Sequence, residues 1–194
     1  MKGLVRLACL LSLPLALVAT ASAQQPVQPP PQPVSGPSLA VTMQFIQDKL
    51  SGLGQVNYAA YNHDNAGQDA DWVTHFTTTD TNIVADPAAC KISYHEKRIK
   101  DDKVTSDADF WFVLSEMQDV IIMPREQLLK KVNTHDGHPT WDARIDPPIY
   151  ILAVQKDENT EWYFYFFDQD LANRVAKAMV HGIELCGGGN KSPF

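Results

Sequence analysis

Residues 149–186 read IYILAVQKDENTEWYFYFFDQDLANRVAKAMVHGIELC, and this stretch holds the clearest fold signals of the chain. Two runs rich in β-branched and aromatic residues, 149–155 and 161–167, flank a polar turn at 156–160, which predicts an antiparallel β-hairpin. In the second run both alternating sets are aromatic: Trp162, Phe164 and Phe166 against Tyr163, Tyr165 and Phe167. We therefore expect this strand to be covered on both faces.

A helix is predicted directly after the hairpin. Asp168 is a natural N-cap, and Asp170 places negative charge in the first turn, where the helix dipole favours it. Two stripes follow at helical spacing: Leu171, Val175, Ala178, Gly182 and Cys186 are expected to pack, and Asp170, Arg174, Lys177, His181 and Glu184 to face water. The glycines at 187–189 end the helix.

Five further strand-like runs lie upstream, separated by Asp, Asn, Gly and Pro. They are residues 56–61, 71–78, 91–98, 109–114 and 119–123. Around the 91–98 run, Cys90, Ile92 and Tyr94 point to one face and Lys91, Ser93 and His95 to the other, which indicates a sheet with one wet face.

An amphipathic helix is predicted ahead of the strands. Its apolar residues are Leu39, Met43, Ile46, Leu50 and Leu53, between Ser38 as N-cap and Gly54 as a stop. The whole order predicts an α+β fold: a bent antiparallel sheet or partly open barrel of about seven strands, with an N-terminal helix and a packed C-terminal helix. We expect one α+β domain at residues 39–189 and a flexible tail at 190–194.

This order of elements resembles the pleckstrin-homology-like superfold over residues 55–186. The resemblance implies an architecture and no particular activity. The segments ADPAACKISYH at 85–95 and LANRVAKAMVHGIELCGG at 171–188 are also similar to exported bacterial proteins of uncharacterised function. That resemblance implies no active-site residues.

The first residues have the parts of a secretory signal. Two basic residues precede an apolar stretch at 7–18, and Ala23 ends a small-residue cleavage motif. We predict a signal peptide at residues 1–23, cleaved after Ala23. The apolar stretch is shorter than the roughly twenty residues that span a bilayer, so we expect an exported protein, periplasmic or secreted, that is not transmembrane.

A Pro/Gln-rich linker, QQPVQPPPQPVSGPS, follows at residues 24–38 and favours extended polyproline conformation. The linker is either a tether that holds the domain away from a surface or a leftover of export, and the sequence leaves both readings open.

The charge of the chain argues against nucleic acid as a partner. The formal net charge is -7, and loss of the signal leaves 14 basic residues against 23 acidic ones, a charge of -9. Such a body repels phosphates. Residues 91–103 are a local basic exception, which is either a solvated strand edge or a site for anionic lipid headgroups.

Cys90 and Cys186 are the cysteines that remain after the signal, and an oxidising compartment favours their pairing. Their wide separation in sequence argues against a catalytic redox pair, whose cysteines lie two residues apart. We predict a disulfide that fastens the closing helix to the sheet. Two buried free thiols or an intermolecular bond are the alternatives.

The region 125–148 carries a loose grouping of residues that suggests a metal site. His135, Asp136 and His138 supply imidazole and carboxylate ligands, and a zinc site would need a further ligand such as His75 or His95. Loop His and Asp residues otherwise cap turns and face water. The region either carries function as a long loop or contains a small extra helix or strand, formed by Leu128, Leu129 and Val132, that packs on the core.

Recognisable catalytic motifs are missing from the sequence, including the Gly-x-Ser-x-Gly elbow and a phosphate-binding glycine loop ahead of a helix. We therefore expect a non-enzymatic binding or structural module of the cell envelope, with no cofactor and no catalytic residue. It would bind an envelope protein or peptide through a sheet edge or the 125–148 loop. The alternatives are a metal-assisted hydrolase that uses residues 135–138, and a module that binds anionic lipid headgroups through residues 91–103.

Overall fold

The computed structural model describes residues 36–67, 71–138 and 140–189, all of which lie in one compact unit. The predicted signal peptide at 1–23 with its cleavage site at Ala23, the linker as far as residue 35 and the predicted tail at 190–194 lie outside the described residues.

Helices begin and end the described part of the chain, with most of the strands between them. In order, the elements are α1 (Leu39–Ser51), β1 (Gln55–Asp64), β2 (Trp72–Asp86), β3 (Lys91–Lys100), β4 (Lys103–Val113), the 3-10 helix η1 (Leu114–Glu116), β5 (Asp119–Pro124), α2 (Arg125–His135), β6 (Trp141–Asp146), β7 (Tyr150–Asp157), β8 (Thr160–Phe166) and α3 (Gln169–Leu185).

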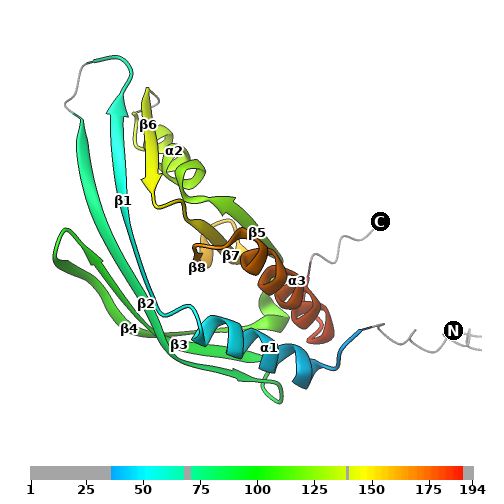
Figure 1. Cartoon of the computed structure of the whole chain (residues 1–194). Coiled ribbons are helices and arrows are strands. Elements are labelled where there is room, and N and C mark those ends of the chain that lie inside the picture. The colour runs from blue at the N-terminus through cyan, green and yellow to red at the C-terminus, as the bar shows by residue number, and fades with distance from the viewer. Residues whose placement is uncertain (1–35, 68–70, 139, 190–194) are drawn as a thin grey trace, which may run out of the picture. The chain divides into compact units, whose positions relative to one another are not determined.

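The strands form two antiparallel sheets. One has five strands in the order β4-β3-β2-β1-β6, and the other has three in the order β5-β7-β8. In Figure 1 the long strands β1 to β4 form a curved layer, and α2 and the three-stranded sheet face it. The predicted α+β class and both flanking helices are confirmed. The described residues form eight strands divided between two sheets, where the sequence predicted one sheet of about seven strands.

The additional elements come from region 125–148. Leu128 is buried in α2, which is the extra packed helix that the sequence allowed, and β6 pairs antiparallel with β1 from Ala59↔Asp146 to Asp64↔Trp141. The apolar residues of β6, Trp141, Ala143 and Ile145, alternate with charged residues, although only Ile145 is fully buried. This alternation is a strand signal that the expected set of seven strands left out.

Strand β8 is covered on both faces, as its two aromatic sets predict. Phe164 and Phe166 lie in one apolar cluster with side chains of α1 and α3, whereas Tyr165 lies in a second with side chains of β1 and α2. Neighbouring β7 divides in the same way, because Leu152 belongs to the first cluster and Ile151 to the second. Strands β7 and β8 are therefore covered on both faces, whereas β5 is only partly buried.

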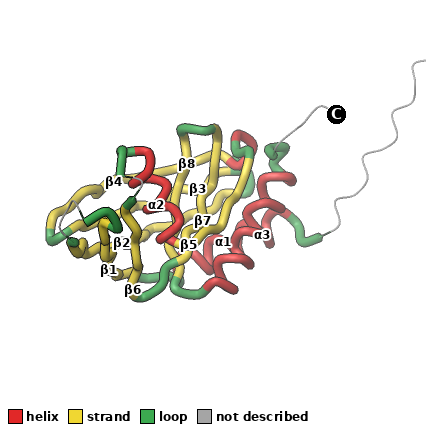
Figure 2. Tube along the Cα trace, turned by 90° about the horizontal axis from the view of Figure 1, so that it is seen from above, coloured by secondary structure: helices red, strands yellow, loops and turns green. Residues whose placement is uncertain are grey.

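The packing face of α3 differs from the predicted stripe. Asp168 caps the helix as expected, accepting hydrogen bonds from the backbone N–H groups of Asp170 (2.8 Å) and Leu171 (3.2 Å). The buried residues are Ala172, Val175, Ala176, Met179, Gly182 and Ile183, while Leu171, Ala178 and Cys186 are only partly buried. The face is wider because α3 packs against both α1, seen beside it in Figure 2, and the three-stranded sheet.

Cys90 and Cys186 form the predicted disulfide, with a Sγ–Sγ distance of 2.03 Å and a Cα–Cα distance of 6.0 Å. Cys90 immediately precedes β3, and Cys186 is the C-cap of α3, where it packs partly buried against the core. The bond therefore fastens the end of the closing helix to the five-stranded sheet. None of the described helices is long and apolar enough to cross a bilayer.

Candidate functional site

A cavity of about 220 Å³ lies between the two sheets, close to the first residue of α2. Strands β1 to β4 contribute one wall, and β8 and α2 contribute the other. The lining residues are Tyr58, Phe76, Thr78, Arg98, Ile99, Lys100, Thr105, Arg125 and Tyr165. Three cations, two phenols, two hydroxyls and a phenyl ring thus meet in one small space.

Arg98 reaches the cavity because the alternation of β3 continues past its apolar part. Ile92 and Tyr94 are buried on the inner face, and Glu96 and Arg98 are the next two residues on that face. Arg98 Nη2 lies 2.5 Å from Glu96 Oε2, and the guanidinium lies 5.4 Å from the centre of the Tyr165 ring. The guanidinium is therefore held between a buried carboxylate and an aromatic face.

Arg125 enters the cavity from the opposite wall, as the first residue of α2 after Pro124. Its Nε donates a hydrogen bond to the hydroxyl of Tyr58 (3.2 Å), and its guanidinium lies 5.9 Å from the centre of the Phe76 ring. No described carboxylate oxygen lies within 4.0 Å of this guanidinium. The positive charge of Arg125 is thus left for a ligand.

Tyr58 supports this arrangement as a neutral phenol. Burial raises the pKa of Tyr58, against the opposing effect of the positive charge on Arg125. The protonated hydroxyl therefore accepts from Arg125 and keeps its own proton for a second acceptor.

The chemistry of the lining suits the binding of an anion with a planar apolar part. A planar guanidinium matches the two oxygens of a carboxylate or phosphate, and aromatic rings pack against a planar apolar body. The described lining residues include no carboxylate, imidazole or thiol that would act as a general base or activate a threonine hydroxyl.

The three proposed metal ligands do not converge. His135 is the last residue of α2, Asp136 caps that helix through its backbone N–H, and the ring of His138 stacks on Trp141 with centroids 3.7 Å apart. Throughout the described ranges, no three His, Cys, Asp or Glu side chains are grouped closely enough to hold a metal ion.

The two histidines proposed as further ligands, His75 and His95, lie on strands of the five-stranded sheet. His75 is an exposed residue of β2, and His95 of β3 hydrogen-bonds through Nδ1 to Asp109 (2.9 Å) and through Nε2 to Asp107 (3.0 Å). The hydrogen bond with Asp109 contributes most to the raised pKa of His95.

The basic side chains of segment 91–103 lie in two different environments. Lys97 Nζ lies 3.8 Å from Asp107 Oδ2, and Lys91 Nζ lies 4.9 Å from the ring centre of the exposed Trp111. Arg98 and Lys100 instead line the cavity. The sequence analysis did not predict that Arg98 points into the cavity. The alternation that it recognised up to Tyr94 places Arg98 on the buried face when the pattern is continued for four more residues.

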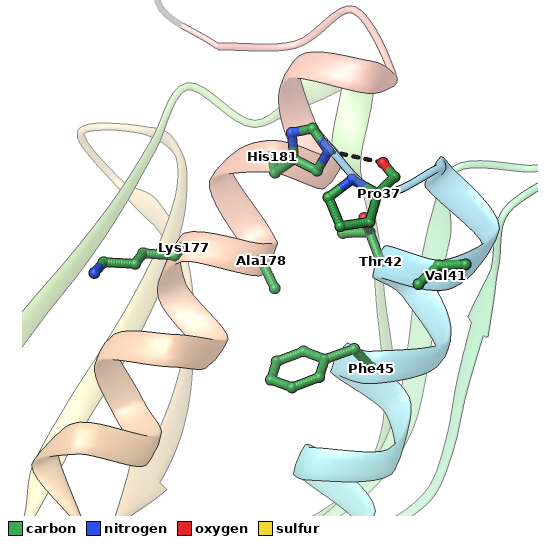
Figure 3. A pocket seen from close by; sticks show the side chains of 7 residues that line it. All are labelled: Pro37, Val41, Thr42, Phe45, Lys177, Ala178 and His181. Carbon is green, nitrogen blue, oxygen red and sulfur yellow. Dashed lines mark hydrogen bonds between the residues drawn. The ribbon is translucent and has the colours of Figure 1, made fainter. Parts of the chain in front are cut away.

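A second hollow, of about 310 Å³, lies between α1 and α3 (Figure 3). It is lined by Pro37, Val41, Thr42, Phe45, Lys177, Ala178 and His181. Phe45 points across it toward α3, the amine of Lys177 points away, and His181 Nε2 lies 2.9 Å from the carbonyl oxygen of Pro37. The surface is mainly apolar, and nothing in the described chain shows what covers it.

Comparisons of the chain with protein-family models, with curated proteins and with solved structures found no match. The resemblances to the pleckstrin-homology-like superfold and to exported bacterial proteins stay predictions. Function is therefore argued from the cavity itself.

Proposed function

We propose that this protein is an exported, non-enzymatic binding module, and that the cavity between its sheets binds a small anion with a planar apolar part. The observation that carries the proposal is Arg125, which faces Arg98 across an aromatic-lined space without a described carboxylate partner. A half-buried cation without a described carboxylate partner favours an anionic ligand, because a hydrogen bond to a charged group is stronger than one between neutral groups.

Export is supported by three observations. The sequence has the parts of a signal peptide at 1–23. The Cys90–Cys186 disulfide is typical of oxidising compartments such as the periplasm or the extracellular space. None of the described helices is suited to crossing a membrane.

The size of the cavity limits the ligand. A volume of about 220 Å³ lies below the roughly 300–1,000 Å³ of pockets that hold drug-sized ligands. That space suits one aromatic ring with a single carboxylate, and benzoate is the simplest probe of this class. An envelope protein or peptide, the partner expected from the sequence, would reach the cavity only through a side chain or terminus of similar size.

Isothermal titration calorimetry of the purified protein with benzoate tests the proposal. Benzyl alcohol has the same ring and a neutral hydroxyl, so it measures the contribution of the charge. We expect benzoate to bind at least about tenfold more tightly, because a hydrogen bond to a charged group contributes about 1.5–3 kcal/mol. Equal binding of the two compounds, or no binding of benzoate up to about 10 mM, would refute the proposal.

Two arginine variants test where the anion binds. Arg125→Ala removes the cation without a described carboxylate partner and should weaken benzoate binding about tenfold or more. Arg144→Ala is the matched control, because Arg144 lies outside the cavity lining, over the ring of Tyr61 at 4.2 Å. Similar losses in both variants would place the anion outside the cavity.

A lipid headgroup offers the same anionic chemistry as a dissolved carboxylate. Cosedimentation with phosphatidylglycerol vesicles distinguishes the two sources. Vesicle binding that benzoate displaces would identify a headgroup as the natural anion. Binding of benzoate without vesicle binding would identify a dissolved molecule, which is the result we expect because the cavity is small.

A further inference from the structure

Two buried carboxylates lie next to the cavity, outside its lining. Asp80 of β2 and Glu96 of β3 are directly opposite each other in the sheet and share its inner face. They are only 9% and 3% exposed. Opposite residues in an antiparallel pair have Cβ atoms roughly 5 Å apart, so the two carboxylates share one dry environment.

The positive charge of Arg98 acts on both carboxylates, but Arg98 forms an ion pair with only one of them. Arg98 forms its ion pair with Glu96, whereas Oδ1 of Asp80 and Nε of Arg98 are buried without a hydrogen-bond partner. When both acids are ionised, the cluster therefore carries two negative charges against one positive charge. Arg98 also lines the cavity, so the same group faces the buried acids and the ligand.

Several other ionisable side chains lie around this cluster. Those contributed by the packed elements are Tyr94 from β3, Tyr165 from β8, Tyr58 from β1, Arg125 from α2 and Lys100 from β3. On α1, the side chain of Asp48 bonds to Gln44 and that of Lys49 lies over Phe45. Burial, together with the charges of Asp80 and Glu96, raises the pKa of Tyr94 further from neutrality.

We infer that Asp80 couples proton uptake to anion binding, so that the cavity binds its ligand more tightly in acid than in base. This inference rests on the proposed function. An anion beside Arg98 is repelled by the two carboxylates, and a proton on Asp80 removes one of these negative charges. Burial, followed by the charge of Glu96, raises the pKa of Asp80 to about 7, against the effect of Arg98, which places the change near neutral pH. By linkage, the bound anion favours the protonated acid to the same degree.

Calorimetric titration with benzoate between about pH 6 and pH 8.5 tests the inference, because benzoate stays ionised throughout. We expect binding to be at least about fivefold tighter at the acidic end, the lower limit of common coupling between sites. Asp80→Asn carries no charge at any pH, so this variant should bind with the affinity of the acidic wild type throughout the range. Circular dichroism confirms that the variant is folded.

Asp107→Asn is the matched control. Asp107 lies on β4 and pairs with His95 and Lys97, away from the Asp80–Glu96 pair, so this variant should keep the wild-type pH dependence. Loss of the pH dependence here would assign it to His95. Benzoate binding that is independent of pH in the wild type, or still dependent on pH in Asp80→Asn, would overturn the coupling and leave the anion site standing. No binding at any pH would overturn both proposals.

Discussion

Replacing Asp80 with Asn should change how the stability of the ligand-free protein depends on pH. Asp80 is 9% exposed, and its Oδ1 has no hydrogen-bond partner. Burial, followed by the charge of Glu96, raises its pKa from 3.8 to about 7, although Arg98 opposes this. One pKa unit corresponds to about 1.4 kcal/mol, so a shift of about three units corresponds to about 4 kcal/mol of unfolding free energy.

The sign follows from proton linkage. The folded protein binds the Asp80 proton more tightly than the unfolded chain does, so unfolding releases a proton between the two pKa values. The contribution of Asp80 to stability is therefore most favourable below about pH 4, and it falls as the pH rises to about 7. The Asn side chain has no titrating proton, so the variant does not lose this stability as the pH rises.

Urea denaturation of both proteins between about pH 4 and pH 8, with the disulfide intact, measures the effect. The difference in unfolding free energy between variant and wild type should move by about 4 kcal/mol in favour of the variant across this range. The comparison cancels other titrating groups, His95 included, because they are present in both proteins. A difference that stays constant with pH would refute the reasoning.

Three further predictions concern the framework around the cavity. Reduction of the Cys90–Cys186 bond, which closes a loop with a sequence separation of 96 residues, should lower the unfolding free energy by about 4–5 kcal/mol in urea titrations, and a change under about 1 kcal/mol would contradict the loop-entropy argument. Phe164→Ala should cost about 3–5 kcal/mol because the ring is fully buried, whereas Phe167→Ala, at a position 48% exposed, should cost under about 1 kcal/mol; equal losses would be inconsistent with the packing of β8. Asp168→Ala should cost about 1 kcal/mol through loss of the α3 cap, and thermal unfolding of that variant at the wild-type temperature would argue against the cap.

The sequence predicted the elements whose periodicity is strong. The hairpin of β7 and β8, the N-cap at Asp168 and the two-sided burial of β8 follow from local pattern alone. The disulfide followed from the two cysteines that remain after the predicted signal peptide. These features need no knowledge of which elements meet in space, which is why they are accessible from one sequence.

Features that depend on partners were missed or misplaced. Strand β6 was missed although its apolar residues alternate with charged ones, because the run is six residues long and its pairing with β1 lies far away in sequence. The packing face of α3 includes Met179 and Ile183, which a single stripe omits, because the helix meets two neighbours. The residues that line the cavity come from six elements, so no spacing of residues within one segment of the sequence predicts it. Only Arg98 left a sequence signal, through the extended alternation of β3.

Crystals grown with 4-iodobenzoate test the central claim most directly, because the anomalous scattering of iodine locates the ligand without reference to any assumed pose. The account predicts one iodine site in the cavity between the sheets, with the carboxylate between Arg98 and Arg125. An empty cavity in crystals that hold the compound elsewhere, or no bound compound in protein saturated with it, would contradict the account.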